Sequence, residues 1–421
     1  MNEMTAIFSI ICVIVVFVVG TIAPINLGVI SFAAAMVIGI VCGIPSATIL
    51  AGFPVSTVMT LMGLCYMLQI ASMNGTIKLM ANGLLKLVRG RYKLLPWIFF
   101  LIAFIITALG TTQSAVVLTL APACMTLAKQ TKASPFMMGL MTAMGAVSGA
   151  YTPLGHFMVT VRGALQPYGL DGLWSTIFLN SFFFCFLIAL VLYLALGGLK
   201  IKSSSGSSED LKLIGVPGKL TVTAQQAATP GAFVILIVGG LVLGYDLGLM
   251  GFVLGLLLTL SNPKRDAEVI KTMPWNIIVV LAGIMTMVNA MDTAGGTDLI
   301  VSTIATSLPP AIAPLVLIAV AAISSFYGTT GPLMGTLTPM AVELMNTLGN
   351  ANVAGMVIAV CIAGLVVDVN PIGITGIGLV SNYPYEDKDR FFAKLMKYGV
   401  AMILVGSVCT WLLFVVLGFH L

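Results

Sequence analysis

Polar residues that could bind a solute recur at matched places in an otherwise apolar chain. Residues 110–114 read Gly-Thr-Thr-Gln-Ser, and Gly-Thr-Thr returns 218 positions later at residues 328–330. The motifs Pro-Leu-Gly at 153–155 and Pro-Ile-Gly at 371–373 share the same offset. Glycine and proline interrupt helices, so each motif predicts a break within an apolar segment. Hydroxyl and amide groups at such breaks are suited to carboxylate oxygens and to hard cations.

Composition indicates what surrounds these motifs. Apolar residues form 59% of the chain, charged residues form 8%, and the mean hydropathy is +1.11. Soluble domains carry about 25% charged residues, so the chain is predicted to cross a bilayer repeatedly. The net charge of +5 is carried by short loops and does not indicate a nucleic-acid partner. The seven cysteines lack metal-ligand spacing and are interpreted as small buried hydrophobes. No organic cofactor is expected.

The predicted fold is an all-α polytopic membrane protein with two halves, 1–199 and 231–421, joined by a cytoplasmic linker at 200–230. The first half is expected to contain spans, a flat segment, a re-entrant hairpin and a broken helix, in the order 5–22, 27–47, 54–73, 76–93 (flat), 94–128 (hairpin), 134–166 (broken) and 172–197. The second half repeats the pattern at 231–244, 247–261, 275–291, 296–308 (flat), 311–346 (hairpin), 350–381 (broken) and 392–418. These are the layout and repeat signature of a secondary transporter.

Basic residues predict how the chain is oriented. Each half has five spans, an odd number, so the halves should be inverted relative to each other. Threading from an outside N-terminus places 18 of the 19 Lys and Arg residues in cytoplasmic loops and leaves only Arg162 outside. The positive-inside rule therefore places both termini outside a cell membrane, such as a bacterial inner membrane. The first hairpin would enter from the cytoplasm and the second from outside.

Four helix breaks would create a site of distinctive charge. Each break offers a helix N-terminus with about +0.5 charge and a C-terminus with about −0.5. Four N-termini sum to about +2, which suits a dianion, and four C-termini suit two monovalent cations. Breaks in hydrocarbon persist where a ligand or water satisfies the freed backbone groups. This argument favours cation-coupled anion transport.

Candidate site residues cluster at the breaks. Residues expected to bind the anion carry hydroxyl, amide or imidazole groups: Thr111, Thr112, Gln113, Ser114, Thr152, His156, Thr329, Thr330 and Asn370. Residues expected to bind Na⁺ offer side-chain or backbone oxygens: Gly110, Thr112, Ser148, Gly328, Thr330, Asp368 and Asn370. The alternative is that the Gly-Thr-Thr and Pro-x-Gly motifs are ordinary kinks with back-bonded threonines. His156 could equally be a satisfied core histidine, and Arg162 an interfacial residue or an attractor of anions.

Asp368 is the one acidic residue deep in a predicted span. An ionised Asp at mid-membrane costs about 3 kcal/mol, so it should be paired, hydrated, protonated or bound to a cation. Two interpretations follow. Asp368 either holds a coupling cation or proton, or caps the helix segment after the break. Ala150 occupies the matching position in the first half, so the two cation sites should differ.

The arrangement of hairpins with polar tips, proline-broken helices and inverted halves resembles the divalent anion/sodium symporter group of the ion transporter superfamily. The N-terminal third, with Pro-Ile-Asn-Leu-Gly at 24–28 and the motif at 110–114, is most similar to malonate/dicarboxylate carriers. Tips in that group usually read Ser-Asn-Thr; this chain has Thr-Gln-Ser at 112–114 and Thr-Thr-Gly at 329–331. The resemblance implies a homodimeric elevator carrying out sodium-coupled symport of malonate or a C4-dicarboxylate.

Three other functions are compatible with parts of the pattern. Proton-coupled or exchange transport of another small organic anion is the main alternative. A channel would usually repeat its hairpins around a symmetric axis, whereas these are inverted within one chain. An enzyme is disfavoured because no His-Glu-x-x-His or Gly-x-Ser-x-Gly motif occurs. The chain is therefore predicted not to be an enzyme.

Overall fold

The computed structural model describes residues 3–23, 25–85, 91–201, 222–260, 262–326 and 330–421, and the regular structure in these ranges is helical. Within these ranges, five helices are long and apolar enough to cross a membrane by length and composition, and six shorter apolar helices of 10–17 residues accompany them. The predicted class, a polytopic all-α membrane protein, agrees with this architecture.

The first half of the described chain is built of ten α-helices and short 3-10 turns. Its helices are α1 (Glu3–Ile22), α2 (Leu27–Cys42), α3 (Ser46–Ala51), α4 (Val55–Met73), α5 (Thr76–Leu85), α6 (Leu95–Ala108), α7 (Gln113–Thr131), α8 (Pro135–Gly149), α9 (His156–Leu165) and α10 (Trp174–Ala195). The expected span 27–47 is split, because Gly43 adopts a left-handed φ of 70° that ends α2. Part of the expected flat segment 76–93 lies outside the described residues.

The second half repeats this order. Its helices are α12 (Ala224–Leu241), α13 (Leu247–Thr259), α14 (Asp266–Thr272), α15 (Trp275–Thr293), α16 (Gly296–Ser307), α17 (Ala313–Phe326), α18 (Thr330–Thr347), α19 (Val353–Val367), α20 (Ile374–Ser381) and α21 (Lys388–Thr410), followed by a π-helical turn at Trp411–Val416. Two boundaries differ from prediction. Helix α12 begins inside the expected linker 200–230, because Thr223 and Gln226 form a capping box. Helix α14 lies between the expected spans 247–261 and 275–291, where no helix was predicted.

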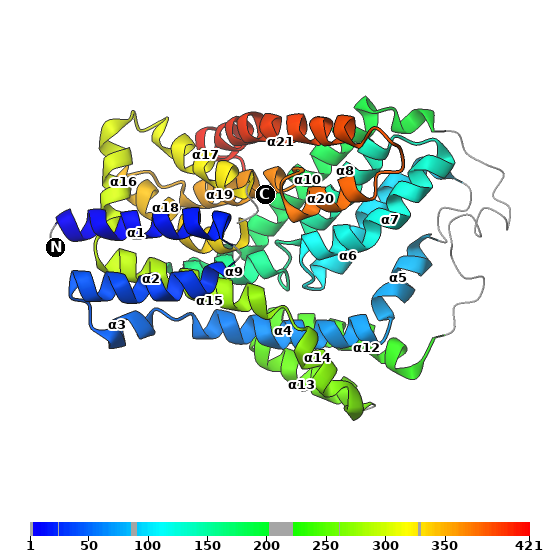
Figure 1. Cartoon of the computed structure of the whole chain (residues 1–421), viewed down its shortest axis with the longest axis horizontal. Coiled ribbons are helices and arrows are strands. Elements are labelled where there is room, and N and C mark those ends of the chain that lie inside the picture. Colours follow the sequence, from blue (N-terminus) through cyan, green and yellow to red (C-terminus); the bar gives the residue numbers. More distant parts are fainter. Residues whose placement is uncertain (1–2, 24, 86–90, 202–221, 261, 327–329) are drawn as a thin grey trace.

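The helices form two bodies with separate cores. Buried residues of α6–α10 and α17–α21 pack into one apolar cluster, here called the hairpin body. Residues of α1–α4 and α12–α15 pack mainly into two other clusters, here called the scaffold body. Figure 1 shows the scaffold body below much of the hairpin body. In sequence, α5 connects α4 of the scaffold body to α6 of the hairpin body, and α16 connects α15 to α17 in the same way.

Glycines bring the scaffold helices into backbone contact. A Cβ atom on Gly283 of α15 would overlap the carbonyl oxygen of Gly28 on α2. A Cβ atom on Gly63 of α4 would overlap the carbonyl oxygen of Gly248 on α13. Each close pair therefore joins one helix of the first half to one helix of the second. The two contacts have matching positions, since Gly28 and Gly248, like Gly63 and Gly283, are 220 residues apart.

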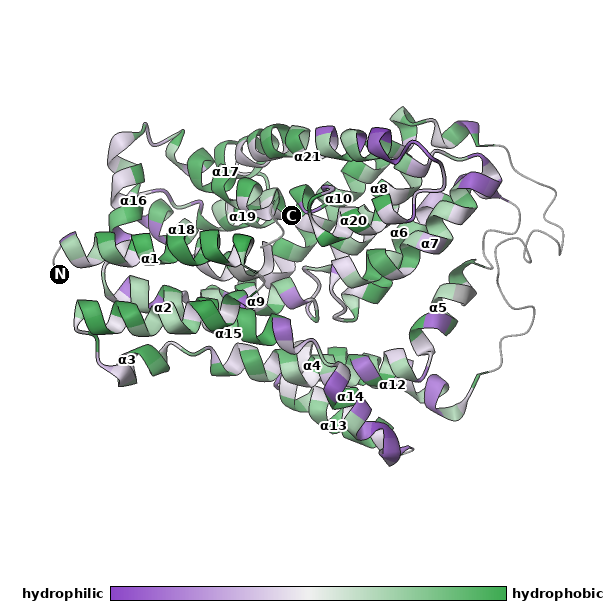
Figure 2. Ribbon diagram, viewed as in Figure 1, coloured by the Kyte–Doolittle hydropathy of each residue, from purple (hydrophilic) through white to green (hydrophobic). Residues whose placement is uncertain are grey.

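Polar residues gather at one end of the molecule. Figure 2 shows hydrophilic segments where α7 ends, at α14 and where α21 begins. Some of the described basic residues of the predicted cytoplasmic loops lie in these segments, among them Lys129, Lys271 and Lys388. Apolar residues dominate the lengths of the helices between the two ends, as a bilayer requires.

Candidate functional site

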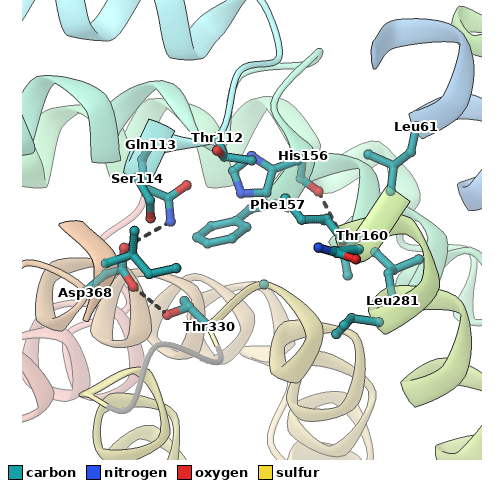
Figure 3. Close-up of a pocket in the computed structure, with 15 residues that line it drawn as sticks. Leu61, Thr112, Gln113, Ser114, His156, Phe157, Thr160, Leu281, Thr330 and Asp368 are labelled. Atoms are coloured by element: carbon teal, nitrogen blue, oxygen red, sulfur yellow. Dashed lines mark hydrogen bonds between the residues drawn. The ribbon is translucent and has the colours of Figure 1, made fainter. Parts of the chain in front are cut away.

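A cavity of about 270 Å³ lies where the hairpin body meets the scaffold body. Four helices of the hairpin body begin at its wall: α7 at Gln113, α9 at His156, α18 at Thr330 and α20 at Ile374. Helices α4 and α15 of the scaffold body close the other side through Leu61, Asn276, Ile277, Val280 and Leu281. Figure 3 shows side chains from both bodies pointing into the space.

Local sequence explains why helices begin here. Gly110 has φ +107°, a conformation that side chains disfavour, and it lets the chain reverse between α6 and α7. Thr112 then caps α7, accepting a hydrogen bond from the Ala115 amide. At the break between α19 and α20, the Asn370 side chain accepts hydrogen bonds from the amides of Ile372 and Gly373, both at 3.0 Å.

The cavity has a positive character without a basic side chain. None of the residues lining it, within the part of the chain that is described, is Lys or Arg. Four helix N-termini, each with about +0.5 charge, supply about +2 in total. Amides in the first turns of such helices, and the neighbouring hydroxyls, are donors suited to carboxylate oxygens. The geometry therefore suits a small anion held by dipoles.

Polar atoms without partners mark the same place. Gln113 Oε1 and His156 Nδ1 are buried at the cavity wall and have no hydrogen-bond partner. Thr111 Oγ1 is also unpartnered, and it lines a neighbouring cavity of about 110 Å³ that shares Thr112 and His156 with the first. A buried unsatisfied group costs about 1–3 kcal/mol, so three together indicate atoms that a ligand or water would satisfy.

One carboxylate connects the two hairpins. Asp368, which is 6% exposed, accepts hydrogen bonds from Gln113 Nε2 at 3.0 Å and from Thr330 Oγ1 at 3.1 Å. Gln113 begins the second helix of the first hairpin and Thr330 that of the second (Figure 3). Thr375 of α20 donates to Asp368 Oδ2 at 3.4 Å. These three bonds come from side chains, whereas the backbone amides of Ile372 and Gly373 in the break donate to Asn370 Oδ1.

Hydroxyl groups extend this network on both sides. Ser325, at the end of α17, lies 2.6 Å from Thr330 Oγ1. Ser114 of α7 lies 3.1 Å from Thr375 Oγ1. The network thus runs from one hairpin through the broken helix to the other. Such a connected polar cluster holds the tips in a defined relative position.

The structure brings together most of the predicted site residues. Those on the wall of the central cavity are Thr112, Gln113, Ser114, His156, Thr330 and Asp368. Gly110 and Thr111 line the neighbouring cavity. Gly328 and Thr329 lie outside the described residues.

Three predicted residues satisfy the backbone instead. Thr152 Oγ1 donates to the carbonyl oxygens of Ala108 and Gly149, at 3.1 and 2.8 Å. Ser148 Oγ donates to Gly145 O, and Asn370 Nδ2 donates to Val367 O. None of the three lines either central cavity. Their side chains donate hydrogen bonds to backbone carbonyl oxygens at helix ends and breaks, where the helix itself supplies no partner.

Other wall residues were missed by the sequence argument. Thr160 lies one turn after His156 on α9, a spacing that places both on one helix face. Phe157 contacts the His156 ring at a centroid distance of 4.3 Å. Asn276, at the start of α15, comes from the scaffold body. The i, i+4 spacing could have revealed Thr160; nothing local marks Asn276.

Comparison with known proteins agrees with this architecture. Residues 3–150, about a third of the chain, match the family model described as the dicarboxylate carrier protein MatC N-terminus. No curated protein matches the chain significantly. The crystal structure of the Alcanivorax borkumensis YdaH transporter is similar, with a TM-score of 0.56 and 12% identity, over 89% of this chain and 87% of that one. This likeness shows the shared fold.

These findings define the class of protein. The chain is a multi-pass membrane protein, and both the family model and the structural neighbour are transporters, not enzymes. The findings support, more particularly, a transporter of the dicarboxylate-carrier type.

Proposed function

We propose that this protein is a secondary active transporter that binds a small dicarboxylate, malonate or a C4-dicarboxylate, in the central cavity and couples its movement to a cation. The observation that carries the proposal is the convergence of four helix N-termini on one cavity whose described lining holds no Lys or Arg. Fixed dipoles of about +2 in total suit two carboxylates, and they need no compensating side-chain charge. A volume of about 270 Å³ suits a small metabolite.

Asp368 supports coupling to a cation. A dianion beside a second buried anion would be repelled, by about 4 kcal/mol per charge pair at 4 Å and an effective dielectric constant of about 20. Binding of Na⁺ near Asp368, Thr330 and Gln113 would remove this repulsion, which makes sodium symport the leading mechanism. Protonation of Asp368 would also remove it. The first half has Ala150 at the matching position, so the two cation sites should differ.

The two bodies support an elevator mechanism with inverted halves. The hairpin body has its own core and carries the four helix starts, and the scaffold body contributes only one face of the cavity. The matched glycine contacts in the scaffold are those expected if the halves are related by a two-fold axis. We infer that the hairpin body moves against a scaffold that forms a homodimer in the bilayer, with the Lys- and Arg-rich end in the cytoplasm.

A binding and uptake experiment tests the function. Purified protein is screened by thermal shift against malonate, succinate and neutral malonamide, in Na⁺ and in K⁺ at equal ionic strength. Stabilisation by a dicarboxylate in Na⁺ alone supports sodium symport, and stabilisation in both salts that grows at low pH supports proton coupling. Saturable accumulation in sealed proteoliposomes then establishes transport. Equal stabilisation by malonamide, or no dicarboxylate response in either salt, would reject the proposal.

A further inference from the structure

A second, larger cavity lies between the two bodies at the end of the molecule that carries α3 and α16 (Figure 1). Its volume is about 420 Å³. The scaffold body contributes the junction of α3 and α4 and the last turns of α15; the hairpin body contributes α18 and the turn that follows α9. It shares no residue with the central cavity, so it is a separate space.

The second cavity, here called the outer cavity, has walls that carry negative charge. Asp292 on α15 and Glu343 on α18 both line it, and no lining residue in the described part of the chain is Lys or Arg. The Tyr168 hydroxyl donates a hydrogen bond to Glu343 Oε1 at 2.7 Å. Burial raises the pKa of Tyr168, and the bond to Glu343 and the charges of Glu343, Asp292 and Asp298 raise it further. The phenol therefore lies in a negative field.

Two polar atoms of α18 at this cavity have no hydrogen-bond partner among the described residues. Thr336 lines the cavity, is 6% exposed, and its Oγ1 has no hydrogen-bond partner. Glu343 Oε2 is also buried without a partner. The two residues are seven positions apart on α18 and therefore lie on the same helix face. A ligand that donates hydrogen bonds and carries positive charge would satisfy both atoms.

Chemistry narrows the class of ligand. The negative walls repel a dicarboxylate, so the cavity does not serve as a second site for the proposed substrate. The volume far exceeds that of one inorganic ion, and the described residues contain no group of three or more His, Cys, Asp or Glu that could hold a metal. Phe53 and Tyr168 add aromatic surface, which attracts ammonium groups through cation–π interaction.

We propose that the outer cavity binds a small organic ammonium ion, with Asp292 and Glu343 as counter-charges and Thr336 as a hydrogen-bond acceptor. A short aliphatic diamine would place one ammonium group against each carboxylate. Because one carboxylate belongs to the scaffold body and the other to the hairpin body, the bound ligand bridges them. The expected effect of this bridge on transport rests on the proposed elevator motion. A protein whose two bodies are bridged by the ligand should transport more slowly.

Binding is tested on the full-length protein in detergent by calorimetry, with putrescine as the probe. Uncharged 1,4-butanediol of similar length and added NaCl of equal ionic strength are the controls. We expect saturable putrescine binding, no binding of the diol, and affinity at least tenfold weaker in Glu343→Gln and Asp292→Asn. Thr336→Val should weaken binding several-fold. Asp171→Asn removes a carboxylate that does not line this cavity and should leave binding unchanged.

The outcome does not depend on whether dicarboxylates are carried, because binding is measured without them. No saturable heat with putrescine, equal binding of the diol, or parental affinity in both carboxylate variants would each overturn the site. If Glu343→Gln fails to fold, Asp292→Asn and Thr336→Val decide the result. If binding is confirmed but putrescine leaves uptake in proteoliposomes unchanged, the ammonium site stands and its proposed bridging role is wrong.

Discussion

Asp368→Asn is the most informative single substitution. The amide can keep the present contacts: its oxygen can accept from Gln113 Nε2, and its nitrogen can face Thr330, whose hydroxyl can rotate to accept. The variant should therefore fold. It removes a charge that, at 4 Å from a cation and an effective dielectric constant of about 20, contributes about 4 kcal/mol. That value corresponds to about a thousandfold in affinity, and solvent and relaxation will reduce it.

We expect the apparent affinity for Na⁺ to fall at least tenfold in this variant, with little change in the preference among dicarboxylates. If the coupling ion is a proton, uptake should instead lose its pH dependence. Both are measured as initial uptake into proteoliposomes over a Na⁺ titration at several pH values, with Asp171→Asn as a control that removes a carboxylate outside the central cavity. Parental Na⁺ and pH responses in Asp368→Asn would refute the assignment of the coupling site.

Three further predictions concern the tip, the scaffold and the topology. Thr111→Val removes an unpartnered hydroxyl, so anion binding should weaken about tenfold by calorimetry while thermal stability does not fall; Thr119→Val, on an exposed part of α7, should bind like the parent. Gly283→Ala would force α15 away from a carbonyl oxygen on α2 and should lower unfolding stability by about 1–3 kcal/mol. Gly83→Ala should not lower this stability, because a Cβ atom at Gly83 meets nothing within 4 Å. Equal melting temperatures of the Gly283→Ala and Gly83→Ala variants would contradict the predicted effect of packing. A single cysteine replacing Lys212 should resist impermeant maleimide in intact cells, and labelling from outside would reverse the predicted orientation.

The sequence revealed helix breaks better than side-chain directions. Glycine and proline act on their own backbone, so the interruptions after Ala108 and Gly149 followed from residue type alone. Thr152 and Asn370 lie at the breaks, and their side chains donate hydrogen bonds to backbone carbonyl oxygens. A polar side chain at a break can turn to the cavity or to a free carbonyl, and composition does not distinguish the two.

Contacts between distant segments were the part that sequence could not supply. Asn276 reaches the cavity because α15 packs against the hairpin body, which depends on tertiary structure. The same is true of the bond from Gln113 to Asp368, which joins residues 255 positions apart. The start of α12 at Ala224, by contrast, was readable from Thr223 and Gln226, which have the spacing of a capping box.

The paired glycines of the scaffold have a consequence for biosynthesis. Since Gly28 contacts Gly283 and Gly63 contacts Gly248, these two backbone contacts of the scaffold wait for helices that are made in the second half of translation. A nascent chain that has inserted only α1–α10 would present two glycine-lined grooves to lipid, with no helix to fill them. The scaffold should then assemble late and in one step, and two separately expressed halves should be degraded alone and rescued by each other.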